Sequence, residues 1–347
     1  MPDITYSSRN FKAPYTGKNF IGSNTLPVPW GKLMHAAVTV GKADATYLNK
    51  HGVLSRYERK MRMYMVKVNF RETVEPKSAL ARFQHTEVYK SLDPSEKTAL
   101  SYFTGLTIAK VLASHFLKVP WLQHYDGYIP LAKGVRPDLL GMNSKGRFVI
   151  MEAKGRTGSA TEELMNTAKG QTKKPPFIND SAGKKQRIIA RVASASYASK
   201  AGILSARWED PEETDLDAPS SVIEPLDFLR QYYEPIRTLI DFEAPGTLEE
   251  KYEGYTFITR FFPEVDVTVG LLNKPLDFYM NESSDLPDSA DSEWYTVFHR
   301  NHVLNNMESV HSDSRELFFG ADGVFIALGS SWNSENMQKE PKQRIHS

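Results

Sequence analysis

Two carboxylates and a lysine in the middle of the chain have the types and spacing for catalysis. Asp138 follows Pro137, and the phrase Glu152-Ala153-Lys154 comes a short run later. Two carboxylates brought close together hold a divalent cation well and repel each other without one. A lysine beside them can orient or deprotonate an attacking water, or offset the charge that develops on a phosphorane. These residue types therefore suit metal-dependent hydrolysis of a phosphodiester.

A β-hairpin is predicted to bring the three groups together. Residues 133–141 and 147–154 have the composition of two strands, and residues 143–146 carry turn residues between them. The unbroken apolar run at 148–151 is typical of a central strand that is covered on both faces. The two acids are therefore expected on adjacent strands, beside a buried part of a sheet.

The register of this hairpin follows from its turn. With the turn centred on Lys145, facing positions sum to 290, so Asp138 lies opposite Glu152 with Cβ atoms roughly 5 Å apart. Lys154 points to the same face as Glu152, because side chains alternate along a strand. The alternative is an exposed hairpin with ordinary charges, although an Asp that faces a Glu is a destabilising choice for structure alone.

The order Pro137-Asp138 and then Glu152-Ala153-Lys154 resembles the PD-(D/E)XK nuclease superfamily, the restriction-endonuclease-like enzymes. The resemblance implies an α/β (α+β) core in which helices flank a central mixed sheet. It also implies a Mg²⁺-dependent (or Mn²⁺-dependent) DNA endonuclease in which Asp138 and Glu152 hold the metal. In the same pattern the backbone carbonyl of Ala153 is a further ligand and Lys154 assists the attacking water. Restriction, anti-phage defence and DNA processing are the roles that the resemblance suggests.

The remaining elements of such a core are expected on both sides of the hairpin. Apolar residues at helical spacing, Tyr102 among them, predict a long first helix. Together the elements place the nuclease-like core at residues 93–208. They are a helix from 93 to about 116 that Pro120 ends, a sheet that begins at Tyr128, a helix at 161–172, and strands at 187–193 and 203–206.

Two further positions of the family pattern have plainer alternatives. Glu96 is the candidate for an extra metal ligand on the first core helix. However, Asp93 and Glu96 have the spacing of a capping box, and we favour that interpretation. Gln171 fits, by position, a polar side chain that some family members carry on the second helix. A solvent-exposed glutamine at a helix end is the alternative.

Composition limits the class of protein. With 347 residues the chain is long enough for two domains, or for one core with large additions. The absence of cysteine excludes disulfides, thiolate zinc sites and cysteine nucleophiles, and it agrees with a cytoplasmic location. The first thirty residues have no signal-peptide pattern, and no apolar run approaches the roughly 20 residues of a membrane span. We therefore expect no membrane partner.

The charge is unevenly distributed along the chain. Residues 1–208 contain 33 Lys and Arg against 14 Asp and Glu, whereas residues 209–293 contain 5 against 22. The predicted site thus lies in a strongly basic part, as a polyanionic ligand such as DNA requires. The cations chosen as candidate nucleic-acid contacts flank or follow the acids: Arg136, Arg156, Lys173 and Lys174.

The flanking regions carry no catalytic motif. Residues 1–92 form a basic, aromatic-rich accessory segment, with loop-like residues 1–27 and a helix over about 43–68. That helix holds a nucleic-acid backbone or packs on the core as an ordinary amphipathic helix. Residues 209–220 are an acidic linker, and residues 221–347 an acidic α/β region. Three roles are open for this last region: it binds a partner protein, it covers the basic groove, or it only balances the charge of the chain.

Two other functions remain open at this point. One is a catalytically inactive subunit of the same fold that binds nucleic acid or a partner protein, although retention of Asp138, Glu152 and Lys154 argues against it. The other is a nuclease that acts on RNA. A homodimer, or a larger complex formed through the acidic C-terminal region, is compatible with each of them.

Overall fold

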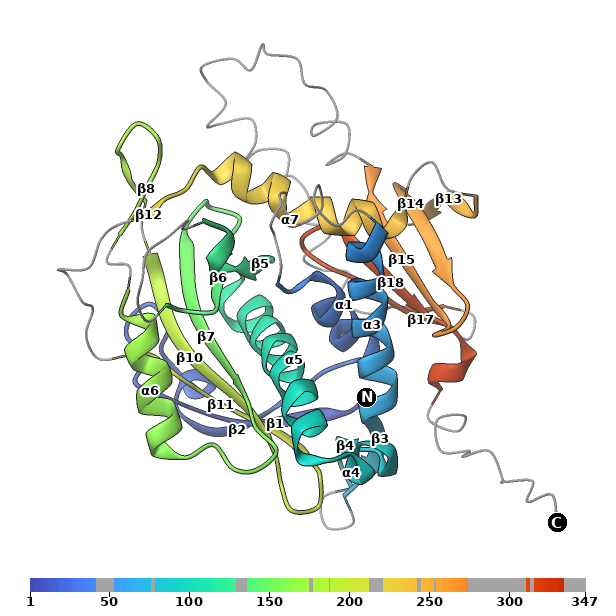
Figure 1. The fold of residues 1–347 in the computed structure, drawn as a ribbon, viewed down its shortest axis with the longest axis horizontal. Helices are drawn as coiled ribbons and strands as arrows, with labels where there is room; N and C mark the ends of the chain where they lie inside the picture. The colour runs from blue at the N-terminus through green and yellow to red at the C-terminus, as the bar shows by residue number, and fades with distance from the viewer. Residues whose placement is uncertain are drawn as a thin grey trace.

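The computed structural model is a mixed α/β protein in which helices flank a central mixed sheet (Figure 1). Its described residues are 1–41, 53–75, 79–128, 136–174, 177–186, 188–211, 221–241, 245–252, 254–273, 310–312 and 315–333. Among them, no helix is long and apolar enough to cross a membrane.

The central sheet has the strand order β3-β4-β1-β11-β10-β7-β6-β5 in the described part of the chain, and β2 pairs with β1. β5, β6 and β7 form an antiparallel meander, whereas β10 runs parallel to β7. A parallel neighbour needs a crossover, and α6 (Glu162–Thr172) supplies it. The strands are β1 Asp3–Arg9, β2 Gly22–Pro27, β3 Phe70–Val74, β4 Ala81–His85, β5 Trp121–His124, β6 Leu139–Met142, β7 Phe148–Gly155, β10 Ile188–Ala198 and β11 Leu204–Glu209.

The hairpin of β6 and β7 has the register predicted from its turn. Leu139 pairs with Met151 and Met142 with Phe148, so facing positions sum to 290. The side chain of Asn143 closes the turn by accepting hydrogen bonds from the amides of Lys145 (2.9 Å) and Arg147 (3.0 Å). The first strand of the hairpin, β6, is shorter than the strand predicted at 133–141, because pairing with β7 begins only at Leu139. Residues 133–135 of the predicted strand lie outside the described residues.

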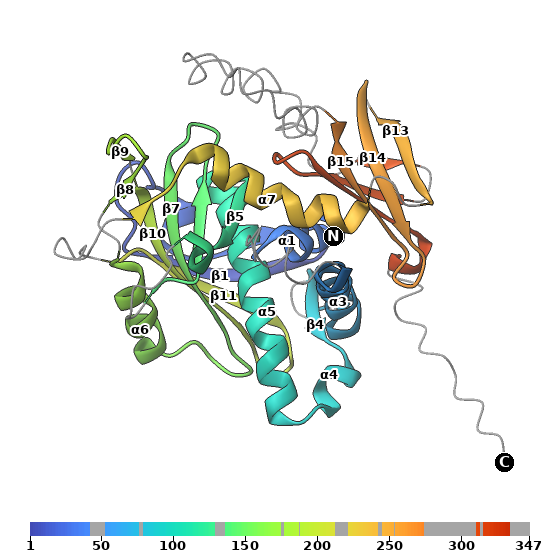
Figure 2. The same ribbon diagram turned by 45° about the horizontal axis from the view of Figure 1, so that its top comes forward.

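Helix α5 (Pro94–Leu112) lies directly on the backbone of β7. A Cβ on Gly155 would stand 1.6 Å from the carbonyl oxygen of Ser101, and one on Gly105 would stand 2.8 Å from the amide nitrogen of Gly155. Only glycine permits this approach. In Figure 2, α5 lies in front of the sheet, beside β7. The apolar residues of α6 pack instead on Ala193 and Ala195 of β10.

The start of the sheet was predicted incorrectly. After α5, a π-helical turn (Ala113–Leu117) leads into β5, which begins at Trp121, and Tyr125–Tyr128 is a 3-10 helix. Pro120 therefore directly precedes the first strand of the meander. The short run between Pro120 and Tyr128 has no alternation of apolar and polar residues, which is why its strand was missed.

The N-terminal residues are part of the same sheet. Residues 1–27 were predicted to be loop-like, which is wrong, because β1 lies between β4 and β11 and pairs with β2. The helices of this region are α1 (Trp30–Thr39), α3 (Val53–Asn69) and α4 (Glu87–Ser91). The part of the predicted helix at 43–52 lies outside the described residues.

A second sheet lies beside the first, and helix α7 (Pro225–Ile240) runs between them (Figures 1 and 2). Its strand order is β13-β14-β15-β18-β17-β16. One apolar cluster includes residues from Ile4 to Trp332, so both sheets share a core. The strands are β13 Thr247–Tyr252, β14 Tyr255–Phe262, β15 Val267–Leu272, β16 Val310–Ser312, β17 Arg315–Phe319 and β18 Val324–Leu328.

A smaller three-stranded sheet is formed by segments that follow α6 and β11 in the chain. It has the order β12-β8-β9, with β8 at Ile178–Asn179, β9 at Lys185–Gln186 and β12 at Ser221–Val222. Residues 212–220, most of the predicted acidic linker, lie outside the described residues, but Glu209 is the last residue of β11 and is fully buried.

A buried polar network joins the turn between β17 and β18 to the helices of the core. Asp322, which has no solvent exposure, bonds through Oδ1 to Nε2 of His35 (2.8 Å). The hydroxyl of Tyr232 donates to Oδ2 of Asp322 (2.5 Å), and Nζ of Lys110 donates to that hydroxyl (3.0 Å). This network therefore ties α1, α5 and α7 to the second sheet.

Candidate functional site

Asp138 and Glu152 hold each other through the backbones of two strands. The amide of Asp138 donates a hydrogen bond to Oε2 of Glu152 (2.9 Å). The amide of Ala153 donates in turn to Oδ2 of Asp138 (3.1 Å). Asp138 stands one residue before β6, so it lies just outside the ladder that pairs β6 with β7. The two acids nevertheless lie close together, because these backbone hydrogen bonds join them.

Lys154 is the third member of this group. Its Nζ donates to Oε1 of Glu152, and its side chain is 26 % exposed, whereas Glu152 has no exposure. In the parallel ladder Glu152 pairs with Ala193 and Lys154 with Ala195, which places both side chains on the face of the sheet that α6 covers. The same-face prediction for the two residues agrees with this register.

The electrostatics of Glu152 are unusual for a carboxylate. Burial, and then the charge of Asp138, raise the pKa of Glu152 to about 8, while the hydrogen bond from Lys154 acts in the opposite direction. Desolvation and a neighbouring like charge both favour the protonated form. A cation placed between the two acids would remove much of this cost.

The backbone at Asp138 and at Arg136, two residues earlier, is fixed from two sides. The amide of Tyr125 donates to the carbonyl of Asp138 (2.9 Å), and Nδ1 of His124 lies 3.3 Å from the same oxygen. From α6, Nε2 of Gln171 donates to the carbonyl of Arg136 (3.3 Å). Gln171 is therefore not simply a solvent-exposed helix end, because it contacts the segment that carries Asp138.

Glu96 lies in a capping box, as the favoured interpretation predicted. Its Oε2 accepts a hydrogen bond from the amide of Asp93 (3.0 Å), and Oδ1 of Asp93 accepts one from the amide of Glu96 (3.0 Å). Glu96 is also exposed, five residues ahead of Ser101, where α5 meets the strand. The capping box therefore explains the presence of a glutamate at this position without a role in metal binding.

The predicted nucleic-acid contacts differ in their surroundings. Arg156 is exposed directly after β7, and Lys174 is exposed after α6, whereas Lys173 is half-buried. Arg136 is half-buried and forms an ion pair with Asp126 (3.2 Å). Arg156 is thus the member of this set that directly follows β7 and is exposed to solvent.

The basic residues of α3 are engaged inside the protein. Arg59 donates to the carbonyls of Val38 (2.8 Å), Val40 (3.0 Å) and Gly41 (3.0 Å), which follow or end α1. Lys67 donates to the carbonyl of Val265 (3.1 Å). Of the two interpretations of this helix, packing on the core is the one that these contacts support.

Tyr102 of α5 lies within electrostatic range of the two acids. It was predicted as part of the apolar face of α5, but its side chain is 41 % exposed. Burial of its hydroxyl and then the charge of Asp138 raise the pKa of Tyr102 to about 12, with a further contribution from Glu152. The apolar pattern of the helix contains no signal for this exposure.

The carboxylates fit a divalent cation in number and in chemistry. Mg²⁺ is bound in proteins by one or two carboxylates together with waters and substrate oxygens. Asp138 and Glu152 supply two such carboxylates, and their mutual repulsion is the physical sign of a site that gains from a cation. Within the described ranges, no three side chains of His, Cys, Asp or Glu gather around one point. A contribution from the carbonyl of Ala153 stays a prediction.

Comparison with known proteins adds no information about the site. A scan against protein-family models, a search of the curated proteins and a search of the solved structures all find no match to this chain. The function is therefore argued from the arrangement of Asp138, Glu152 and Lys154 and from the sheet that positions them.

Proposed function

We propose that this chain is a metal-dependent DNA endonuclease with a restriction-endonuclease-like core. The observation that carries the proposal is the reciprocal bonding of Asp138 and Glu152, with Lys154 on the second acid. A fully buried carboxylate beside a second carboxylate costs stability, and strongly perturbed carboxylates in proteins cluster at functional sites. The pair is therefore better explained by chemistry than by folding.

The order of elements also supports this fold assignment. α5 is followed by the meander of β5, β6 and β7, then by α6, and then by β10, which is parallel to β7. Asp138 stands one residue before β6, and Glu152 and Lys154 stand near the end of β7. This is the order that the PD-(D/E)XK resemblance implies for helix, strands and catalytic residues.

Asp138 and Glu152 would hold a Mg²⁺ or Mn²⁺ ion, which when bound lowers the pKa of a coordinated water and stabilises charge on a phosphate. The amides of Asp138 and Ala153 orient the two carboxylates beforehand. Hydrolysis forms a phosphorus–oxygen bond to water and breaks one to a sugar oxygen. The ammonium of Lys154 is placed to offset the negative charge that this transfer develops.

The charge of the surrounding chain favours a polyanionic substrate. Residues 1–208 carry 33 basic against 14 acidic residues, and they include both sides of the site. Contacts between Lys or Arg side chains and phosphates supply most of the sequence-independent affinity of proteins for DNA. Arg156, exposed directly after the catalytic strand, is the described cation best placed to contribute.

The test is cleavage of supercoiled plasmid with Mg²⁺, with Mn²⁺ and with EDTA. Wild type is compared with Asp138→Asn and Lys154→Met, and with Glu163→Gln, an exposed residue of α6, as the control. We expect metal-dependent nicking or linearisation that both site variants lose and the control retains. Cleavage by both site variants would contradict the proposal. DNA binding without any cleavage would favour the inactive subunit.

A further inference from the structure

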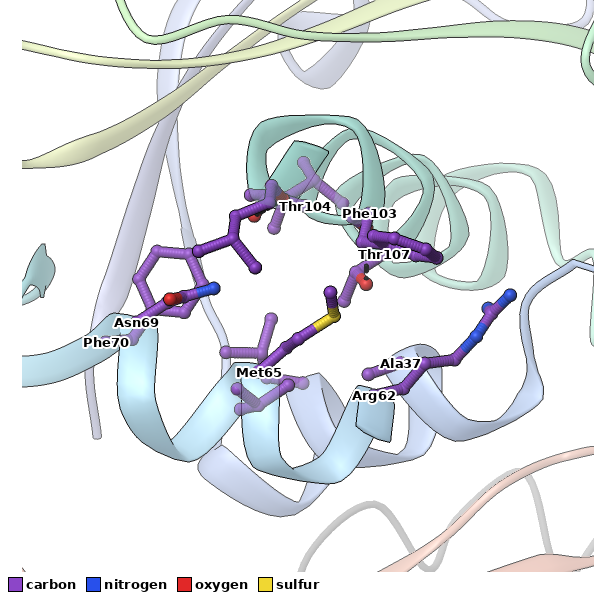
Figure 3. Close-up of a pocket in the computed structure, with 12 residues that line it drawn as sticks. Ala37, Arg62, Met65, Asn69, Phe70, Phe103, Thr104 and Thr107 are labelled. Atoms are coloured by element: carbon purple, nitrogen blue, oxygen red, sulfur yellow. Dashed lines mark hydrogen bonds between the residues drawn. The ribbon is translucent and has the colours of Figure 1, made fainter. Parts of the chain in front are cut away.

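Two arginines of α3 face into the protein and add little to its surface charge. Arg59 and Arg62 are both buried. Figure 3 shows Arg62 beside the pocket that α3 shares with α5, and its Nε donates to Oε1 of Glu58 (2.7 Å). The basic excess of residues 1–208 therefore reaches a polyanionic ligand from other elements.

Two exposed cations stand on the turn between β6 and β7. The side chain of Asn143 accepts hydrogen bonds from the amides of Lys145 and Arg147, and the amide of Gly146 donates to the carbonyl of Asn143 (2.9 Å). These bonds fix the backbone of the turn. Lys145 and Arg147 are exposed, and neither forms an ion pair within the described part of the chain.

A second pair of exposed cations stands on the hairpin of β8 and β9. Asp180 closes this hairpin, because its Oδ1 accepts from the amide of Lys184 (2.8 Å) and its Oδ2 from the side chain of Gln186 (3.1 Å). The Nζ of Lys185 lies 4.2 Å from the centroid of the Phe177 ring. Lys184 and Lys185 are exposed, and no described residue forms an ion pair with either.

The turn and the hairpin stand at the same end of the central sheet. In the parallel ladder Phe148, the first residue of β7, pairs with Ile188, the first residue of β10. Arg147 directly precedes Phe148, and Gln186 ends β9 two residues before Ile188. Figures 1 and 2 show β8 at this end of the sheet, beside β7 and β10. The four cations therefore belong to one surface, the basic end of the sheet.

Helix α6 leads from the face that carries Glu152 and Lys154 to this basic end. Its last residue is Thr172, whose carbonyl accepts a hydrogen bond from Arg191 of β10 (2.8 Å). Along β7, Glu152 is four residues from Phe148, which is about 13 Å at the rise of a strand. A DNA duplex rises about 3.4 Å per base pair, so this distance corresponds to about four base pairs.

Two carboxylates contact the hairpin, and hydrogen bonds engage both of them. Asp180 closes the hairpin, and Oε1 of Glu224 accepts from the amide of Ser181. The four exposed cations outnumber these two acids, so the basic end carries a positive charge. Phosphates are the charged groups that a duplex presents outward along its whole length. Because bonds close both turns before any ligand arrives, binding there costs little ordering of the backbone.

We propose that the basic end of the sheet binds the phosphate backbone of duplex DNA, through Lys145 and Arg147 of the turn and Lys184 and Lys185 of the hairpin. This inference rests on the proposed nuclease function for its choice of ligand. Contacts to phosphates position a duplex without reading its sequence. A duplex bound there lies a few base pairs from the carboxylates, where one of its phosphodiesters is cleaved.

The test measures the binding of a short fluorescein-labelled duplex by fluorescence anisotropy, in EDTA and over a series of salt concentrations. Each phosphate contact contributes about 0.9 to the slope of log affinity against log salt concentration. Two double variants are compared with wild type, Lys184→Ser with Lys185→Ser and Lys145→Ser with Arg147→Ser. We expect each to reduce this slope by about 2 and to weaken binding at about 0.1 M salt by at least tenfold.

The control removes two exposed lysines that stand elsewhere, Lys200→Ser with Lys251→Ser. Lys200 follows β10 at the end of that strand opposite Ile188, and Lys251 stands on β13 of the second sheet. We expect this control to keep the slope of wild type. Equal losses on two duplexes of unrelated sequence are also expected, because the contacts are to phosphates.

Four outcomes would overturn the inference. They are no duplex binding by wild type, a slope that neither double variant changes, an equal change in the control, and a loss on duplex RNA without a loss on DNA. Because the assay contains no metal, its result is separate from cleavage. Metal-dependent cleavage with unchanged slopes would leave the nuclease standing and remove the binding surface. The expected slopes without any cleavage by wild type in Mg²⁺ would do the reverse.

Discussion

The amide of Asp138 donates a 2.9 Å hydrogen bond to Oε2 of Glu152. The amide of Ala153 returns a bond of 3.1 Å to Oδ2 of Asp138, so each carboxylate is oriented by the backbone of the other's strand. Catalytic groups work best when surrounding bonds hold them in place before the substrate arrives. The hairpin therefore fixes the two carboxylates relative to each other while keeping Glu152 fully buried.

The first prediction concerns the dependence of stability on pH without metal. Burial and Asp138 raise the pKa of Glu152 from 4.5 to about 8. The folded state thus binds the Glu152 proton more tightly than the unfolded state, so this stabilisation is present below pH 4.5 and is lost as the pH rises to 8. Glu152→Gln removes the titration. We expect the stability of wild type relative to this variant to fall from pH 5 to pH 8.

Urea unfolding in EDTA at several pH values measures this difference. Burial lowers the pKa of His85 and of His124 to about 4, and their effect has the opposite sign, with stability gained as the pH rises from 4 to 6.5. Both histidines are present in wild type and in Glu152→Gln, so the comparison isolates the acid. Identical pH profiles for the two proteins would show that Glu152 keeps an ordinary pKa.

A second prediction concerns the contact between α5 and β7. Gly155→Ala places a Cβ 1.6 Å from the carbonyl oxygen of Ser101, and the helix must move to admit it. We expect a loss of roughly 3 kcal/mol in unfolding free energy, at the upper end for overpacking. Gly158→Ala is the matched control, because no atom lies within 4 Å of its Cβ. Equal unfolding midpoints for the two variants would refute the close contact.

The third prediction separates capping from metal binding at Glu96. Glu96→Ala removes the bond to the amide of Asp93. By the usual cost of a lost helix cap we expect about 1 kcal/mol of destabilisation, measured by urea unfolding. Nuclease activity per folded molecule should stay unchanged. A stable Glu96→Ala protein that no longer cleaves DNA would instead assign the residue to the metal.

A fourth prediction addresses the buried network of Asp322. Asp322→Asn keeps the shape of the side chain but leaves the charge of Lys110 without its nearby anion. Removal of one partner from a buried charged pair costs about 3–5 kcal/mol. Asp227→Asn, at an exposed ion pair with Arg230 (3.4 Å), should change stability by less than about 1 kcal/mol. Thermal unfolding of both variants provides the comparison.

Local chemistry was enough to predict several parts of the fold. The turn residues around Lys145 set the register of β6 and β7, because a two-residue period leaves no freedom once the turn is placed. Asp93 and Glu96 marked the start of α5, and Thr161, whose side chain accepts from the amide of Leu164 (3.2 Å), marked that of α6. These signals act over a few residues and need no knowledge of distant contacts.

Long-range packing explains what the sequence did not predict. β1 contains Ser and Thr in place of a clear apolar pattern, and its place in the sheet depends on pairing with β11 about two hundred residues away. Arg59 was interpreted as a possible nucleic-acid contact, but it donates to the backbone that follows α1. The electrostatic influence of Asp138 on Tyr102 was not predicted either, because it depends on where α5 crosses β7 at Gly155.

The most direct test of the carboxylate pair is its affinity for Mn²⁺, measured by isothermal titration calorimetry on the full chain. This measurement needs neither the correct substrate nor a partner. We expect saturable Mn²⁺ binding to wild type and to Glu163→Gln, and loss of this binding in Glu152→Gln. Equal Mn²⁺ binding in Glu152→Gln and wild type would contradict the assignment of Asp138 and Glu152 as the metal site.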